Sequence, residues 1–143
     1  MKKLFFAIAL VLVIFGLFTI YQSKNKENIG NELEKKDLIV LDTPRPNEII
    51  KSPLKITGEA RGMWFFEASF PIELKDANGV IIAEWYATAQ GEWMTEKFVP
   101  FESTVVFKNS PTSKNGTLIL KKDNASGLPE YDDALEIPIL FDK

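Results

Sequence analysis

The stretch "FPIELKDANGVIIAEWYATA" (residues 70–89) decides the fold class of this chain. Apolar residues recur at alternate positions on both sides of "DANG", which is the pattern of a β-strand with one buried face. Within "DANG", Asn78 and Gly79 can adopt the positive φ values that a tight turn needs. The pattern therefore predicts an antiparallel hairpin. Its inner faces are expected to consist of Phe70, Ile72 and Leu74 before the turn, and Ile81, Ala83, Trp85, Ala87 and Ala89 after it.

The residues before this hairpin continue the alternation back to Trp64. Trp64, Phe66 and Ala68 then join the core face. Phe65 projects from the opposite face, and Met63 also falls outside the core pattern. The sequence thus predicts one long strand that begins at Trp64, with Phe65 and Met63 at the surface.

Turn-forming clusters of Gly, Pro, Asn and Asp divide the rest of residues 38–143 into short runs rich in β-branched and aromatic residues. Seven such runs in about 105 residues are typical of an all-β domain, an immunoglobulin-like antiparallel β-sandwich with one core. Pro138 cannot donate a ladder hydrogen bond, so the last strand is expected at a sheet edge or at a bulge. The expected strands are 38–42, 53–60, 64–75, 80–89, 97–108, 117–122 and 134–141.

An uncharged hydrophobic segment runs from Leu4 to Tyr21, after two lysines. Its 18 residues would span about 27 Å as a helix, close to the roughly 30 Å hydrocarbon core of a bilayer. A cleaved signal peptide begins in the same way but usually has a shorter apolar region and small residues at the cut. We therefore expect residues 1–21 to be one transmembrane helix that anchors the chain, with a cleaved signal peptide and a secreted domain as the alternative.

The orientation of this anchor follows from what flanks it. The lysines on the two sides do not fix it by their number. Almost nothing precedes the segment and a whole domain follows, as in a signal-anchor whose C-terminal domain is exported. The chain is therefore expected to be a single-pass protein of the cell membrane with an extracytoplasmic domain.

Residues 22–37, "QSKNKENIGNELEKKD", are polar and contain only two aliphatic residues. This composition predicts a flexible linker, and a coil of this length would hold the domain on the order of 22 Å from the membrane. A short helix on "NELEKK" is the competing interpretation. Residues 38–143 then form the β-sandwich domain.

Three segments of this domain resemble a known family. They are "SPLKITGEARGMWFFEASFPIELKDANG" (52–79), "AQGEWMTEKFVPF" (89–101) and "KKDNASGLPEYDDALEIPILF" (121–141). Together they are similar to the immunoglobulin-like domain of bacterial spore germination proteins. Ala125 departs from the pattern, since a proline is expected there. The resemblance implies an Ig-like sandwich outside the membrane with a role in binding or assembly, and it implies no catalysis.

Several functional classes are disfavoured by composition. The chain has no cysteine and no histidine, so a thiol nucleophile, a zinc thiolate site and a Ser-His-Asp triad cannot be built. From residue 39 onward, 11 Lys and Arg face 16 Asp and Glu, a net charge of −5 that disfavours nucleic-acid binding. We expect no enzyme activity, no catalytic residues and no cofactor.

The acidic segment "DNASGLPEYDD" (123–133) offers oxygen ligands of the kind that Ca²⁺ takes. It lacks the spacing of an EF-hand loop, and acidic loops are usually only solvated. Calcium is therefore a weak hypothesis, and no metal is the main expectation. The candidate ligands are Asp123, Glu130, Asp132 and Asp133.

A second group of candidates is apolar. If Met63, Phe65, Trp93 and Met94 cluster, they form a patch beside Arg61 that suits a protein partner or a glycan. Alternatively, these side chains pack against a loop or each other, and Arg61 pairs with a carboxylate for structural reasons. The sequence therefore favours a tethered binding or assembly module with a protein partner in the cell envelope. A carbohydrate-binding module with Trp93 and Phe65 as stacking residues is the alternative.

Overall fold

The computed structural model describes residues 12–13 and 27–142. The predicted anchor, Leu4 to Tyr21, lies almost wholly outside these residues. None of the helices in the described part is long and apolar enough to cross a membrane.

The described residues form an all-β domain with one short α-helix and two 3-10 helices. All seven expected strands have a counterpart, and the two-residue strand β2 is additional. The strands are β1 (Ile39–Thr43), β2 (Ile49–Ile50), β3 (Leu54–Arg61), β4 (Ser69–Asp76), β5 (Ile81–Ala89), β6 (Phe98–Val105), β7 (Asn115–Lys121) and β8 (Ala134–Phe141). The helices are α2 (Glu32–Lys35), η1 (Gly62–Trp64) and η2 (Pro129–Tyr131).

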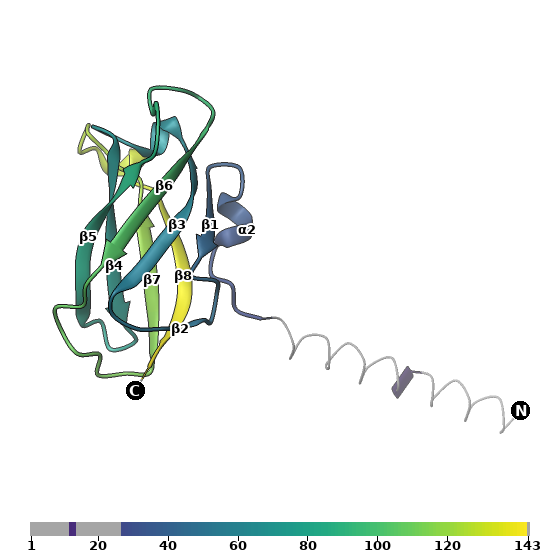
Figure 1. Cartoon of the computed structure of the whole chain (residues 1–143). Helices are drawn as coiled ribbons and strands as arrows, with labels where there is room; N and C mark the ends of the chain where they lie inside the picture. Colours follow the sequence, from purple (N-terminus) through teal and green to yellow (C-terminus); the bar gives the residue numbers. More distant parts are fainter. Residues whose placement is uncertain (1–11, 14–26, 143) are drawn as a thin grey trace, which may run out of the picture.

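The strands form one curled sheet with the order β1-β3-β6-β5-β4-β7-β8-β2. All neighbours are antiparallel except β2 and β8, which are parallel. β5 and β6 pair only at Thr88–Glu102 and Ala89–Phe101, so the sheet folds over along this seam into two facing layers (Figure 1). The prediction of two packed layers is confirmed, but they are parts of one continuous eight-stranded sheet.

The core lies between the two layers. Phe70 of β4 packs edge-on against Phe101 of β6, with 4.9 Å between ring centroids, and so joins the two layers directly. Trp64 is fully buried and is the largest side chain in this core. As predicted, Ile72, Leu74 and the odd-numbered apolar residues of β8 also face inward.

The predicted long strand that begins at Trp64 is wrong in its first part. β3 ends at Arg61, η1 follows, and β4 starts only at Ser69. A side chain on Gly62 would collide with the backbone carbonyl oxygens of Thr95 and Trp93, so only glycine fits at this bend, where the chain leaves β3 and enters η1. The residues between η1 and β4 are not in a strand. The alternation of their apolar side chains therefore does not predict which of them face the core.

As a result the two phenylalanines exchange their predicted places. Phe65 is buried, with 4% of its surface exposed, and its ring lies 5.3 Å from that of Phe70. Phe66 is 45% exposed and stands at the base of a two-residue turn formed by Glu67 and Ala68.

β5 departs from the predicted pattern in a second way. A bulge lies opposite Leu74 and Lys75, so Ile82 and Ala83 are both buried although they are adjacent. Trp85, predicted to be in the core, is 54% exposed. Trp85 is on the same face of β5 as the buried Ala83. At Trp85, however, β5 forms no hydrogen bonds with β6, so the two layers do not close over the indole.

The hairpin turn between β4 and β5 is organised by Asp76. Only Gly79 of "DANG" has a positive φ, 80°. One carboxylate oxygen of buried Asp76 accepts hydrogen bonds from the amides of Asn78 (3.0 Å) and Val80 (2.9 Å). The other accepts from the amide (2.7 Å) and the hydroxyl (2.5 Å) of Thr112. The carboxylate therefore ties this turn to the segment between β6 and β7.

These contacts make the stability of the domain depend on pH in the acid range. The Thr112 hydroxyl first, and then the backbone amides, outweigh the effect of burial and lower the pKa of Asp76 from 3.8 to about 2. A lowered pKa contributes stability that is complete above pH 3.8 and is lost as the pH falls towards 2. In thermal melts, Asp76→Asn is therefore expected to lower the Tm at pH 7, and the difference from wild type should shrink between pH 4 and pH 2. A difference in Tm that does not change with pH would contradict this role.

Residues 27–37, which are 11 of the 16 residues of the expected linker, pack on the domain, and we call them the N-terminal clamp. The Asn31 side chain donates to the Ala134 carbonyl (3.0 Å) and accepts from the Glu136 amide (2.8 Å), so it takes the place of a neighbouring strand on β8. The Asn31 amide donates to the Glu136 carbonyl (3.3 Å). The competing interpretation, a short helix in "NELEKK", matches α2. Only residues 22–26 of the expected linker lie outside the described part.

β8 is the last strand but one in the sheet, and no strand flanks its outer side at Pro138, which agrees with the sheet edge that this proline predicted. β2 lies outside β8 at Leu140 and Phe141. Before that point, the Asn47 amide donates to the Pro138 carbonyl (2.7 Å), and Asn31 covers the start of the strand. The outer side of β8 is thus covered by contacts from single residues. Pro138 has no amide hydrogen, so it needs no acceptor on this side.

Candidate functional site

Three connections lie together at one end of the domain, opposite the C-terminus (Figure 1). They are residues 62–68, 90–97 and 122–133, which we call the loop end. The Gly62 amide donates to the Lys97 carbonyl (3.2 Å), and the Asp123 amide donates to the Trp64 carbonyl (3.0 Å). These two bonds hold the first connection against the other two.

The loop end exposes large apolar side chains from all three connections. Met94 is the most exposed large hydrophobic residue of the described chain, at 73%. Exposed apolar groups gathered at one end of a soluble domain are typical of an interaction surface. The exposed members are Met63, Phe66, Met94, Leu128 and Tyr131.

The predicted binding residues divide between surface and core. Met63 and Met94 are exposed at the loop end, as expected. Phe65 is buried, so it presents no ring face for stacking, and Trp93 is half-buried against the core. Phe66, Leu128 and Tyr131 were not predicted as binding residues, although the last two belong to the acidic segment 123–133.

Arg61 has a structural role at the edge of this surface. Its guanidinium donates to the carbonyl oxygens of Asp37 (3.1 Å) and Glu96 (3.2 Å) and stacks over the Phe98 ring at 4.0 Å. No carboxylate of residues 27–142 forms an ion pair with Arg61, so the carboxylate partner expected from the sequence is not found. Arg61 therefore fixes the base of the 90–97 connection and joins it to the clamp.

The turn that presents Phe66 is strained. Glu67 (φ 49°) and Ala68 (φ 62°) are both in the left-handed region, as a two-residue hairpin turn requires. Side chains with a Cβ disfavour this region, and Asn-Gly is the usual pair there. The turn therefore displays Glu67 and Phe66 at a cost in conformational energy.

Relief of this strain is measurable. Ala68→Gly is expected to raise the free energy of unfolding by about 1 kcal/mol, because glycine adopts the left-handed conformation freely. Ala77→Gly is the control, since Ala77 lies in a turn but has no positive φ. Urea denaturation should show stabilisation only for Ala68→Gly; equal effects of the two changes would argue against strain at this turn.

The loop end is also strongly acidic. Its three connections hold seven carboxylates and two lysines, a net charge of −5. The remainder of residues 39–143 has nine basic and nine acidic side chains, so the whole net charge of the domain resides in these loops. Burial first, and the charge of Glu67 second, raise the pKa of Asp123 above its usual value.

The calcium hypothesis receives no support from the geometry. Asn124 donates to the Asp132 carboxylate (2.7 Å) and to the Leu128 carbonyl (2.8 Å), and Lys35 pairs with Asp133 (2.6 Å). Within residues 27–142, no three Asp or Glu side chains come together as a metal site. The acidic segment is instead held by its own hydrogen bonds and by the clamp.

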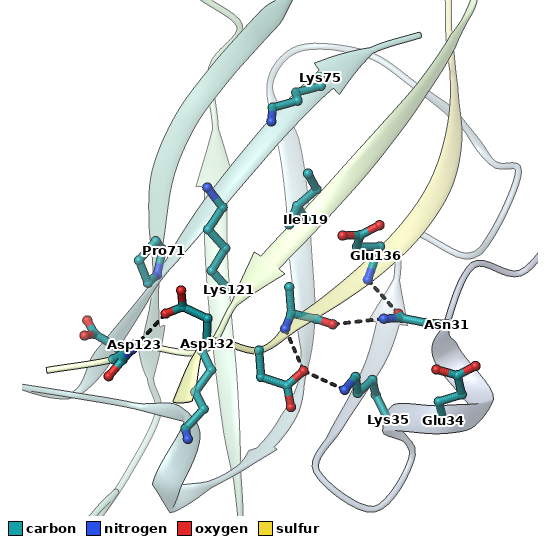
Figure 2. Close-up of a pocket in the computed structure, with 14 residues that line it drawn as sticks. Asn31, Glu34, Lys35, Pro71, Lys75, Ile119, Lys121, Asp123, Asp132 and Glu136 are labelled. Atoms are coloured by element: carbon teal, nitrogen blue, oxygen red, sulfur yellow. Dashed lines mark hydrogen bonds and ion pairs between the residues drawn. The ribbon is translucent and has the colours of Figure 1, made fainter. Parts of the chain in front are cut away.

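A groove of about 810 Å³ lies on the outer face of β4, β7 and β8, bordered by α2 and the acidic segment (Figure 2). Ile119 and Pro71 contribute its apolar surface, and lysines and carboxylates mix along its walls. Several of its polar groups already have structural partners, including Asn31 with β8 and Lys35 with Asp133. The groove could not be predicted from the sequence because the clamp forms one of its sides.

One carboxylate beneath this face is buried. Glu73 pairs with Lys75 (2.5 Å) and with Lys121 (2.7 Å), which both line the groove. Burial acts to raise the pKa of Glu73, but the hydrogen bonds and charges of Lys121 and Lys75 outweigh it and lower the pKa. Glu73 is therefore a charged structural residue that joins β4 to β7, and it is not poised as a general base.

Comparison with known proteins places the chain in a family. Residues 38–127 match the family model described as the immunoglobulin-like domain of bacterial spore germination. No curated protein matches the chain, and no solved structure does. The match spans β1 to β7 and the start of the acidic segment, and it agrees with the curled all-β fold. The chain therefore belongs to the family of immunoglobulin-like domains of bacterial spore germination.

Proposed function

We propose that this protein is a non-catalytic binding and assembly module of the bacterial cell envelope, tethered to the membrane with its domain outside. The observation that carries the proposal is the loop end, where exposed apolar side chains lie among an excess of carboxylates. Membership of the Ig-like family supports a binding role in general terms. Glu73, the buried carboxylate beneath the groove, is already paired with two lysines, which fits a structural role better than a catalytic one.

The clamp gives the tether a defined geometry. The expected anchor ends at Tyr21 and the clamp begins at Glu27, so residues 22–26 alone would join them. Five extended residues reach at most about 17 Å. The incoming chain meets the domain at Asn28, whose carbonyl accepts from the side chain of Asn47 beside Pro138, in the half of β8 away from the loops. A domain held in this way presents its loop end away from the bilayer.

The glycan-binding alternative loses the residues on which it rested. Phe65 is buried and cannot stack on a sugar, and Trp93 is half-buried against the core. Trp85 and Tyr86 are exposed on β5, but they lie outside the loop end. Protein binding is therefore the better-supported function.

Two experiments on intact cells test the proposal. A protease added outside should digest the domain without lysis; survival until lysis would contradict the orientation. Cross-linking of the full chain, compared with a chain truncated after residue 37, should capture the same envelope protein repeatedly only when the domain is present. Capture of nothing, or of glycan strands alone, would overturn the binding role proposed here.

A further inference from the structure

We propose that the loop end docks a positively charged polypeptide surface that has an apolar centre. This inference rests on the proposed binding function and names the surface and the chemistry of its partner. Its first basis is the distribution of charge. The three connections carry the net charge of −5, and the remaining 9 basic and 9 acidic side chains of residues 39–143 balance.

Two carboxylates of the loop end are available to a partner. Glu67 and Glu130 are exposed, and neither forms a hydrogen bond or ion pair among the described residues. After burial, the negative charge of Glu67 is the second cause that disfavours the ionised form of the Asp123 carboxyl and raises its pKa. A lysine or arginine placed between these groups would relieve like-charge repulsion, which makes a cationic partner electrostatically complementary.

Apolar side chains supply the second half of the argument. Phe66 and Met94 come from different connections, and both stand clear of the core. Methionine and aromatic side chains are enriched at the centres of protein interfaces, where they account for much of the affinity. A simple cation would satisfy the carboxylates but would leave these apolar groups in water. The occupant therefore needs both basic and apolar side chains.

The same charges oppose other occupants. Anionic lipid headgroups, anionic wall polymers and nucleic acids would all be repelled by the loop end. A second copy of this surface would bring like charges together. A basic polypeptide is the class that the surface favours.

The test uses the full chain in detergent and three short synthetic peptides: one of Lys and Leu, one of Lys and Ser, and one of Glu and Leu. We expect the Lys/Leu peptide to bind most tightly. Binding should weaken about tenfold in Glu67→Lys/Glu130→Lys and in Phe66→Ser/Met94→Ser, as for removal of interface hot spots.

Matched variants make this test specific. Glu59→Lys/Glu102→Lys changes the net charge by the same amount on exposed strand positions, and Ile49→Ser/Val106→Ser removes exposed apolar groups far from the loops. Both should bind within about twofold of wild type. Equal losses in loop and control variants, or equal binding of the Lys/Leu and Lys/Ser peptides, would overturn the inference.

Failure of this inference can be told apart from failure of the proposed function. If cross-linking in cells captures an envelope protein equally well with wild type and with the two loop variants, the module binds through another surface and only the inference is overturned. If wild type captures no protein while the Lys/Leu peptide still binds at the loop end, the inference stands and the proposed cellular role fails.

Discussion

Trp64→Ala is expected to lower the free energy of unfolding by about 3–5 kcal/mol, the usual cost of truncating a large buried aromatic side chain. Trp64 is fully buried in the core, directly after the bend at Gly62, and its backbone carbonyl holds Asp123 of the acidic segment. The total stability of a domain of this size is itself about 5–15 kcal/mol, so this loss is a large fraction of it. Urea denaturation followed by fluorescence measures it.

A second tryptophan provides the control. Trp85→Ala removes a side chain of the same size that is 54% exposed, and it is expected to change stability much less than Trp64→Ala. Trp64→Phe should also be milder than Trp64→Ala, because the indole N–H has no hydrogen-bond partner in the described structure and its loss leaves nothing unsatisfied. Equal destabilisation by Trp64→Ala and Trp85→Ala would contradict the assigned core.

Removal of residues 1–36 is expected to destabilise the domain by about 2–4 kcal/mol relative to removal of residues 1–26. The longer truncation removes the three hydrogen bonds of Asn31 to β8, each worth about 1 kcal/mol, and the partly exposed Lys35–Asp133 and Glu32–Arg45 ion pairs, worth less. It also bares the edge of β8, which favours association through that strand.

The two truncated proteins can be compared by urea denaturation and by gel filtration. We expect a lower urea midpoint and more aggregation for the longer truncation alone. In the full chain, Asn31→Ala should reproduce about half of the loss, whereas Glu34→Ala, on the same segment but without a structural partner among the described residues, should be neutral. Identical midpoints for the two truncations would show that residues 27–36 are a passive linker.

Much of the fold could be predicted from the sequence because its strands alternate regularly. Phe70, Ile72 and Leu74 lie inward as expected, and "DANG" forms the predicted turn. The alternation failed at Gly62, because a tight bend in the backbone resets the faces, and sequence spacing does not record such a bend. It failed again at Trp85, where the burial of a side chain depends on whether a neighbouring strand closes over it.

The candidate site could be predicted only in part. Met63 and Met94 were identified because they do not fit the core pattern, and both are exposed. The contribution of Leu128 and Tyr131 depends on how the acidic segment packs beside η1, which is a tertiary contact. The clamp was missed for a similar reason, since Asn31 pairs with a strand that lies more than a hundred residues later in the chain.

Site-specific photo-cross-linking in intact cells tests the central claim most directly. A photoreactive residue would replace Met94 at the loop end or, as a control, Val106, which is also exposed but lies at the far end of β6. We predict a discrete protein adduct from position 94 that is absent from position 106 and is lost when Glu67→Lys/Glu130→Lys is added. The same adduct from both positions, or an adduct at position 94 that the charge reversal does not reduce, would contradict a binding module that acts through its acidic loop end.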